Sequence, residues 1–86
     1  MIVQNFYFTF GTDPQYPYGI NDYVLIRCPD AGTACKLFNA IHPKRPTHNV
    51  MNCAFMYNEA QWDMGVKKYY TGREPVESII ISRAGD

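Results

Sequence analysis

The sequence predicts a single α+β domain in which two helices pack on one face of a four-stranded sheet. Apolar residues alternate with polar ones in several short runs, and two other segments carry apolar stripes with helical spacing. The chain of 86 residues is long enough for one domain. A domain of this size buries only about 60–65% of its unfolded surface, so its core must be dense. An aromatic content of 15% suits that need, because each ring buries a large area.

The first two strands are predicted at residues 2–10 and 23–28. The first strand places three phenylalanines on one face, Phe6, Phe8 and Phe10. The second strand alternates in the same way and ends at Pro29. Twelve residues, 11–22, connect the two strands, although a hairpin needs only two to five. This long connection therefore calls for an explanation of its own.

A helix is predicted over residues 31–41. Apolar residues recur at i, i+3, i+4 and i+7 from Ala34 to Ile41, which is the spacing of one helix face. Asp30 occupies the N-cap position, where a carboxylate accepts a backbone hydrogen bond. Pro43 ends the helix, because the residue before a proline avoids helical geometry.

A third strand is predicted at 51–57 and a second helix at 59–71. Asn58 followed by Gln61 has the spacing of a capping box, which marks the start of a helix. Gly72 suits the position just after the last helical residue.

The last strand is predicted at 76–81. Its three consecutive isoleucines favour a well-covered position near the middle of the sheet. Residues 83–86 are expected to form a frayed tail. The predicted order is ββαβαβ, and residues 1–86 form one domain without a repeat or a linker.

Composition and charge limit the possible partners. Eight basic and eight acidic side chains give a formal net charge of zero, so we expect no general affinity for duplex nucleic acid. Neutrality also makes self-association easier, so a homo-oligomer is possible. No apolar run approaches the roughly 18 residues of a membrane span, and we expect no membrane partner.

The cysteines predict a location rather than a metal site. Cys28, Cys35 and Cys53 form no CxxC pair and are odd in number, which favours reduced thiols in the cytoplasm, either of the producing cell or of a cell that its producer enters. Structural zinc sites usually bring ligands in close pairs, and none occurs here. We therefore predict no metal and no cofactor.

Two stretches together resemble a family of small phage and mobile-element proteins. One is Phe6-Tyr-Phe-Thr-Phe-Gly11 followed by Asp22-Tyr-Val-Leu-Ile26, and the other is Ala54-Phe-Met-Tyr-Asn-Glu-Ala-Gln-Trp62. The chain is similar in these to small uncharacterised proteins of phages and mobile elements of Gram-positive bacteria. Those proteins carry a Tyr-Phe-Thr-Phe-Gly start and an aromatic strand that leads into an acidic helix. The resemblance implies the context of an accessory gene, whose products are often inhibitors, decoys or sequestering proteins, and it brings no catalytic residue.

The 11–22 connection is the first candidate binding segment. Its tyrosines and prolines are typical of a stiff recognition loop. Tyr16 and Tyr18 are candidates to stack on a ligand or partner, with Asp13, Asn21 and Asp22 as hydrogen-bond acceptors. The alternative is a loop whose tyrosines fold down as lids over the core.

The 42–49 segment is the second candidate. It contains His42, Lys44, Arg45 and His48, and a cluster of donors on a proline-rich loop suits phosphate groups. The alternative is a solvated surface turn. If both segments lie at one end of the sheet, tyrosines beside cations form a pocket for a small anionic, nucleotide-like ligand.

The sequence thus favours a non-enzymatic binding module, with two alternatives. The first is an inhibitor or adaptor that binds a host protein through the same aromatic loop. The second is a hydrolase in which Cys53 is activated by His42 or His48, although Cys53 shares a strand face with Met51 and Phe55 and reads as core.

Overall fold

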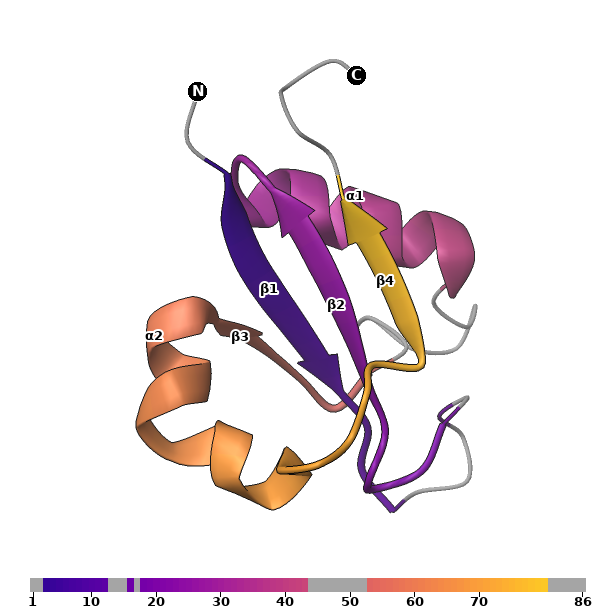
Figure 1. Ribbon diagram of the computed structural model, residues 1–86. Coiled ribbons are helices and arrows are strands. Elements are labelled where there is room, and N and C mark those ends of the chain that lie inside the picture. The colour runs from indigo at the N-terminus through magenta and orange to yellow at the C-terminus, as the bar shows by residue number, and fades with distance from the viewer. Residues whose placement is uncertain (1–2, 13–15, 17, 44–52, 81–86) are drawn as a thin grey trace.

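The computed structural model describes residues 3–12, 16, 18–43 and 53–80. Within these residues the order of elements is β1 (Gln4–Thr9), β2 (Tyr23–Cys28), α1 (Ala31–Ile41), β3 (Phe55–Asn58), α2 (Glu59–Gln61), the π-helical turn η1 (Trp62–Val66), the 3-10 turn η2 (Lys67–Tyr70) and β4 (Glu77–Ile80). The turns η1 and η2 continue α2 as one helical segment (Figure 1). The predicted α+β class, the element order and the four-stranded sheet are confirmed.

The strands form one mixed sheet in the order β3-β1-β2-β4. β1 is antiparallel to both β2 and β3, whereas β4 is parallel to β2. In this register Tyr7 pairs with Leu25 on one side and with Tyr57 on the other. The neighbouring Phe8 pairs with Val24 and Met56, so these three side chains point to the opposite face.

The helix α1 covers the phenylalanine face of the sheet. Phe38 of α1 stacks on Phe8 with the ring centroids 4.4 Å apart and the planes within 10°. The Asp30 carboxylate caps α1 by accepting from the Thr33 backbone N–H at 2.8 Å, as its position predicts. The buried residues of this core are Phe6, Phe8, Phe10, Val24, Ile26, Cys28, Ala34, Phe38 and Cys53.

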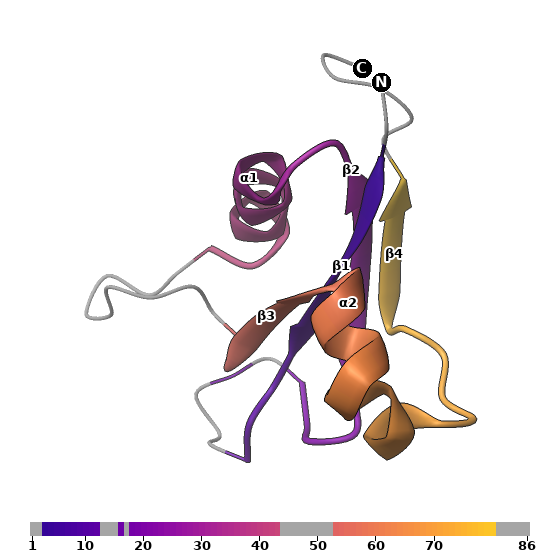
Figure 2. The ribbon, with the colours of Figure 1, turned by 90° about the vertical axis from the view of Figure 1, so that its left-hand side faces the viewer.

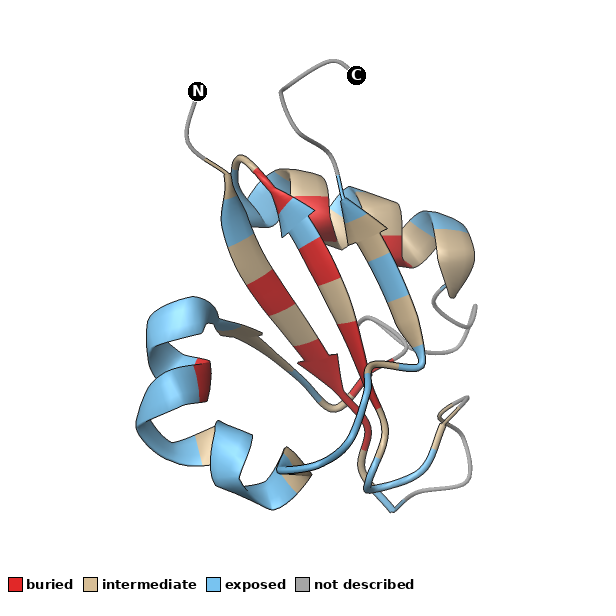
Figure 3. Cartoon of the chain, in the orientation of Figure 1, coloured by how far each residue is buried: buried red, intermediate tan, exposed pale blue. Residues whose placement is uncertain are grey.

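The second helical segment packs on the other face of the sheet. Trp62 of η1 stacks on Tyr7 with the centroids 4.2 Å apart and the planes within 4°, and its ring lies 4.9 Å from that of Tyr23. Trp62 is 4% exposed, whereas the rest of the segment is exposed or half-buried (Figure 3). The Asn58–Gln61 capping box that starts α2 is confirmed, with both reciprocal hydrogen bonds present at 2.8 and 2.9 Å.

The expectation that both helices lie on one face of the sheet is therefore wrong. Adjacent residues of a strand point to opposite faces, and β1 carries a ring on each, Tyr7 under Trp62 and Phe8 under Phe38. A sheet with aromatic side chains on both faces needs a cover on both. Figure 1 shows α1 behind the strands, and in Figure 2 it lies well apart from α2.

The placement of the last strand is a second correction. β4 is an edge strand of the described sheet, not a middle one, and 66% of Ile80 is exposed. The isoleucine run misled because its two described members differ: Ile79 points to the α1 core, through its pairing with Ile26, and Ile80 points to the other face. The predicted tail, 83–86, lies outside the described residues.

Candidate functional site

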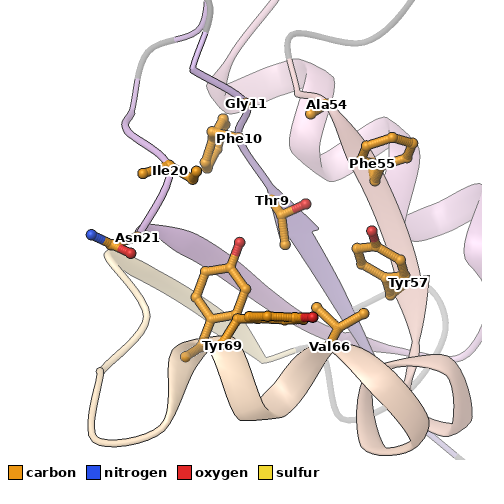
Figure 4. A pocket seen from close by; sticks show the side chains of 11 residues that line it. Thr9, Phe10, Gly11, Ile20, Asn21, Ala54, Phe55, Tyr57, Val66 and Tyr69 are labelled. Carbon is orange, nitrogen blue, oxygen red and sulfur yellow. The ribbon is translucent and has the colours of Figure 1, made fainter.

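A pocket of about 350 Å³ lies at the end of the sheet where β1 ends, and we name it the end pocket. Three parts of the chain form its walls: the end of β1 with the described part of the 11–22 connection, β3 with the residue before it, and the turns η1 and η2 (Figure 4). Its lining residues are Thr9, Phe10, Gly11, Ile20, Asn21, Ala54, Phe55, Tyr57, Val66, Tyr69 and Tyr70.

The wall from β3 follows from strand geometry. Phe55 and Tyr57 are two residues apart, so both side chains point to the Trp62 face of the sheet, and their ring centroids lie 6.0 Å apart. The ladder ends at the pairing of Thr9 with Phe55. Among the described residues no strand continues the ladder beyond this pairing, and in Figure 4 Phe55 faces Ile20 across the pocket.

Tyr70 positions the pocket wall that η2 provides. The Tyr70 ring packs 5.0 Å from Trp62 and 5.3 Å from Tyr23, which holds the turn against the sheet. Adjacent helical residues point about 100° apart. Tyr69 therefore projects outward at the rim of the pocket, with 70% of its surface exposed.

The end pocket is apolar and electrically neutral. All of its lining residues are uncharged types. Burial raises the pKa of Tyr70, which outweighs a hydrogen bond with Thr9 that acts in the opposite direction, so this phenol remains protonated at neutral pH. Three rim residues are large, apolar and mostly exposed: Ile20 at 57%, Phe55 at 62% and Tyr69 at 70%.

The two predicted binding segments do meet, but on the α1 side of the sheet. The Tyr18 hydroxyl donates to Glu77 Oε1 at 3.1 Å, and His42 Nε2 lies 2.5 Å from the same oxygen. The Tyr18 and His42 rings pack edge to face at 5.4 Å, and Tyr18 also packs against Phe10. We call Tyr18, His42 and Glu77 the Glu77 cluster. Its members bond to one another, which is the lid arrangement that the sequence left open as the alternative.

The other predicted site residues separate. Asn21 is exposed and lines the end pocket. Asp22 instead closes a turn, because its carboxylate accepts from the Gly19 backbone N–H at 2.9 Å. Tyr16 is half-buried and packs against the core beside Gly11. Asp13, Lys44, Arg45 and His48 lie outside the described residues.

Most of the pocket wall was missed by sequence reasoning. Phe55 was interpreted as part of a core strand face with Met51 and Cys53, although β3 lies at the sheet edge and 62% of Phe55 is exposed. The exposure of one of Tyr69 and Tyr70 could be predicted from the sequence, because two adjacent helical side chains cannot both point toward the core. No single segment of the sequence could predict the end pocket, because its walls come from three separate parts of the chain.

The cysteine and metal alternatives gain no support from geometry. Cys53 is only 5% exposed, and burial raises the pKa of its thiol to about 12, so it stays protonated at neutral pH. Across 3–12, 16, 18–43 and 53–80, no three His, Cys, Asp or Glu residues are grouped to hold a metal ion. No helix within these ranges is long and apolar enough to cross a bilayer.

Comparison of the chain with protein-family models, with curated proteins and with solved structures finds no match.

Proposed function

We propose that the protein is a non-enzymatic binding domain that holds a small ligand in the end pocket. The observation that carries this proposal is a neutral concavity of about 350 Å³ whose walls include three tyrosine rings and two phenylalanine rings. Ligand sites of roughly 300–1,000 Å³ with mostly apolar walls and a few polar groups are typical of small-molecule recognition. The end pocket lies at the small end of that range.

The walls are rigid enough to recognise a shape. Tyr70 is held between Trp62 and Tyr23, and Phe10 is only 2% exposed and packs against Tyr18. Rings fixed in this way lose little entropy when a ligand binds. Together with the resemblance to phage proteins, this supports an inhibitory or sequestering activity toward a small nucleotide-like ligand. The 42–49 segment, which was expected to hold the anionic part of that ligand, supplies no residue to the lining that the structure describes.

A ligand screen followed by NMR tests the proposal. The ¹⁵N-labelled protein is titrated with a library of nucleotides and uncharged fragments, and we expect shifts at amides of the lining residues. Tyr69→Ala should weaken binding without unfolding the domain, because its side chain is 70% exposed. Met64→Ala, 88% exposed on the same segment and not part of the lining, serves as the matched control. Failure of every compound to shift the lining amides would overturn the proposal.

A second candidate is a protein-binding inhibitor or adaptor. It is favoured by the exposed rim of the end pocket, where Ile20, Phe55 and Tyr69 are each more than half exposed. Apolar residues around a concavity often anchor a partner's side chain. Affinity purification from a host lysate tests this, and a stoichiometric partner that is lost with Phe55→Ala but kept with Met64→Ala supports it. A homo-oligomer detected by light scattering and abolished by Phe55→Ala would place a second copy at the rim.

A further inference from the structure

We propose that the end pocket recognises a flat, uncharged heteroaromatic ring, of the chemical class of a nucleobase, and leaves any attached phosphate groups in solvent. This rests on the proposed function and states which part of the ligand the site recognises.

The neutral lining favours an uncharged ligand group. A phosphate among these residues would lose its hydration, and no lining side chain could replace it with a positive charge. Thr9 and Tyr70 at the inner end carry neutral hydroxyl groups, and a neutral hydroxyl cannot balance the charge of an anion. The part of the ligand that enters the end pocket is therefore neutral.

The aromatic walls favour a flat ring over an aliphatic group or a sugar. Phe55 and Tyr57 on one side face Ile20 on the other, with Tyr69 between them at the rim (Figure 4). Every nucleobase has two apolar faces that stack on aromatic side chains. A sugar has a hydroxyl on nearly every carbon, and each one that is buried needs a hydrogen-bond partner. The side chains left to provide partners are Asn21, Tyr57 and Tyr69.

These polar groups match the edge of a heteroaromatic ring. Asn21 is exposed at the mouth of the pocket with its amide directed outward (Figure 4), and a rotation of its side chain toward a ligand would let the amide donate and accept at once. A side-chain amide pairs in this way with the donor and acceptor on the edge of adenine. The arrangement thus offers stacking to the ring faces and hydrogen bonds to one ring edge.

Lys68, a cation beside this wall, contributes little to the binding of phosphate. Lys68 Nζ lies 5.2 Å from the centroid of the Tyr69 ring, and Lys68 is exposed. An ion pair with such a side chain is weak and is screened at physiological salt. A phosphate that extends past the rim should therefore add little to the affinity.

The test compares four probes by ¹⁵N NMR titration of the full chain at 50 and 300 mM NaCl: adenosine, adenosine 5′-monophosphate, ribose 5-phosphate and glucose. We expect the two adenine compounds to shift the lining amides with dissociation constants within about threefold of each other at both salt concentrations. Ribose 5-phosphate and glucose should not bind. Tyr69→Ala should weaken adenosine binding by roughly tenfold through lost stacking, and Met64→Ala should leave it unchanged.

Two results would overturn the inference and leave the proposed function intact. One is binding of ribose 5-phosphate or glucose at the lining residues, or a phosphate gain above about tenfold that disappears at high salt. The other is no shift from adenosine while compounds of the wider screen bind the end pocket. Failure of all compounds in that screen would overturn the proposed function and this inference together.

Discussion

Trp62 is the single residue on which the second layer of the molecule depends. It is 4% exposed and its ring contacts those of Tyr7, Tyr23 and Tyr70. Trp62→Ala should lower the free energy of unfolding by about 3–5 kcal/mol, because it removes the buried partner of all three rings. Urea denaturation followed by circular dichroism measures the change. Met64→Ala, two residues along and 88% exposed, should stay within about 0.5 kcal/mol of the parent, and equal costs for the two variants would contradict this account.

The Glu77 carboxylate accepts hydrogen bonds from two segments that are far apart in the sequence. Its Oε1 bonds to the Tyr18 hydroxyl and to the His42 ring, and its side chain points to the α1 face of the sheet. Glu77→Gln keeps the shape but removes the charge that strengthens both bonds, and it should cost about 1–2 kcal/mol of unfolding free energy.

The Glu77 prediction has an internal check. Glu74→Gln, at an exposed position in the connection before β4, should be neutral. Tyr18→Phe combined with Glu77→Gln should cost less than the sum of the single changes, because one removes the hydrogen bond that the other weakens. Strict additivity in thermal or urea unfolding would show that the cluster does not act as a unit.

At the scale of elements, the capping box determines where the second helical segment starts. The Asn58 side chain accepts from the Gln61 N–H, and the Gln61 side chain accepts from the Asn58 N–H. Asn58→Ala should destabilise the protein by about 1 kcal/mol, whereas Asn58→Gly should cost only a few tenths. Urea unfolding of the two variants provides the measurement, and a glycine variant as unstable as the alanine variant would argue against a capping effect.

In this second helical segment the position of the helix was predicted correctly, but the geometry of its turns was not. The sequence places one helix at 59–71, and the described chain is helical from Glu59 to Tyr70. Its turns, however, widen to π geometry at Trp62–Val66 and tighten to 3-10 geometry at Lys67–Tyr70. These changes accompany the contacts of Trp62 and Tyr70 with the sheet, so they depend on distant residues that no local pattern contains.

At the scale of the whole molecule, buried acidic protons make stability depend on alkaline pH. Burial raises the pKa of the Cys53 thiol to about 12 from its ordinary value of 9.0, and burial also raises the pKa values of Tyr7, Tyr23 and Tyr70. The folded protein holds these protons more tightly than the unfolded chain does. The stabilisation is therefore complete below pH 9 and is lost as the pH rises toward 12.

Urea titrations between pH 8 and 11 measure this loss. Each such group can contribute up to about 1.4 kcal/mol per pH unit within its window. Cys53→Ala should show a shallower decline than the parent, because one of the titrating groups is gone. A stability that rises with pH over this range would contradict the assignment of these groups as buried acids.

Local patterns predicted the elements well and the assembly less well. The bounds of α1 follow from its N-cap and from the proline after it. Those of β2 follow from apolar alternation and from a proline at its end. All of these features act within a few residues. The side of the sheet on which Trp62 packs depends on Tyr7 and Tyr23, which precede it by many positions. The end pocket depends on three separate segments, and among the predicted binding residues that the structure describes only Asn21 lies in its lining.

The parallel pairing of β4 with β2 has a consequence for synthesis on the ribosome. The partner of β2 on that side is Glu77–Ile80, so a nascent chain that ends before these residues leaves one edge of β2 without its hydrogen bonds. That edge belongs to the strand that carries Val24 and Ile26, so an incomplete chain offers a template for aggregation. Translational pausing shortly before residue 77 should therefore increase the demand for chaperones.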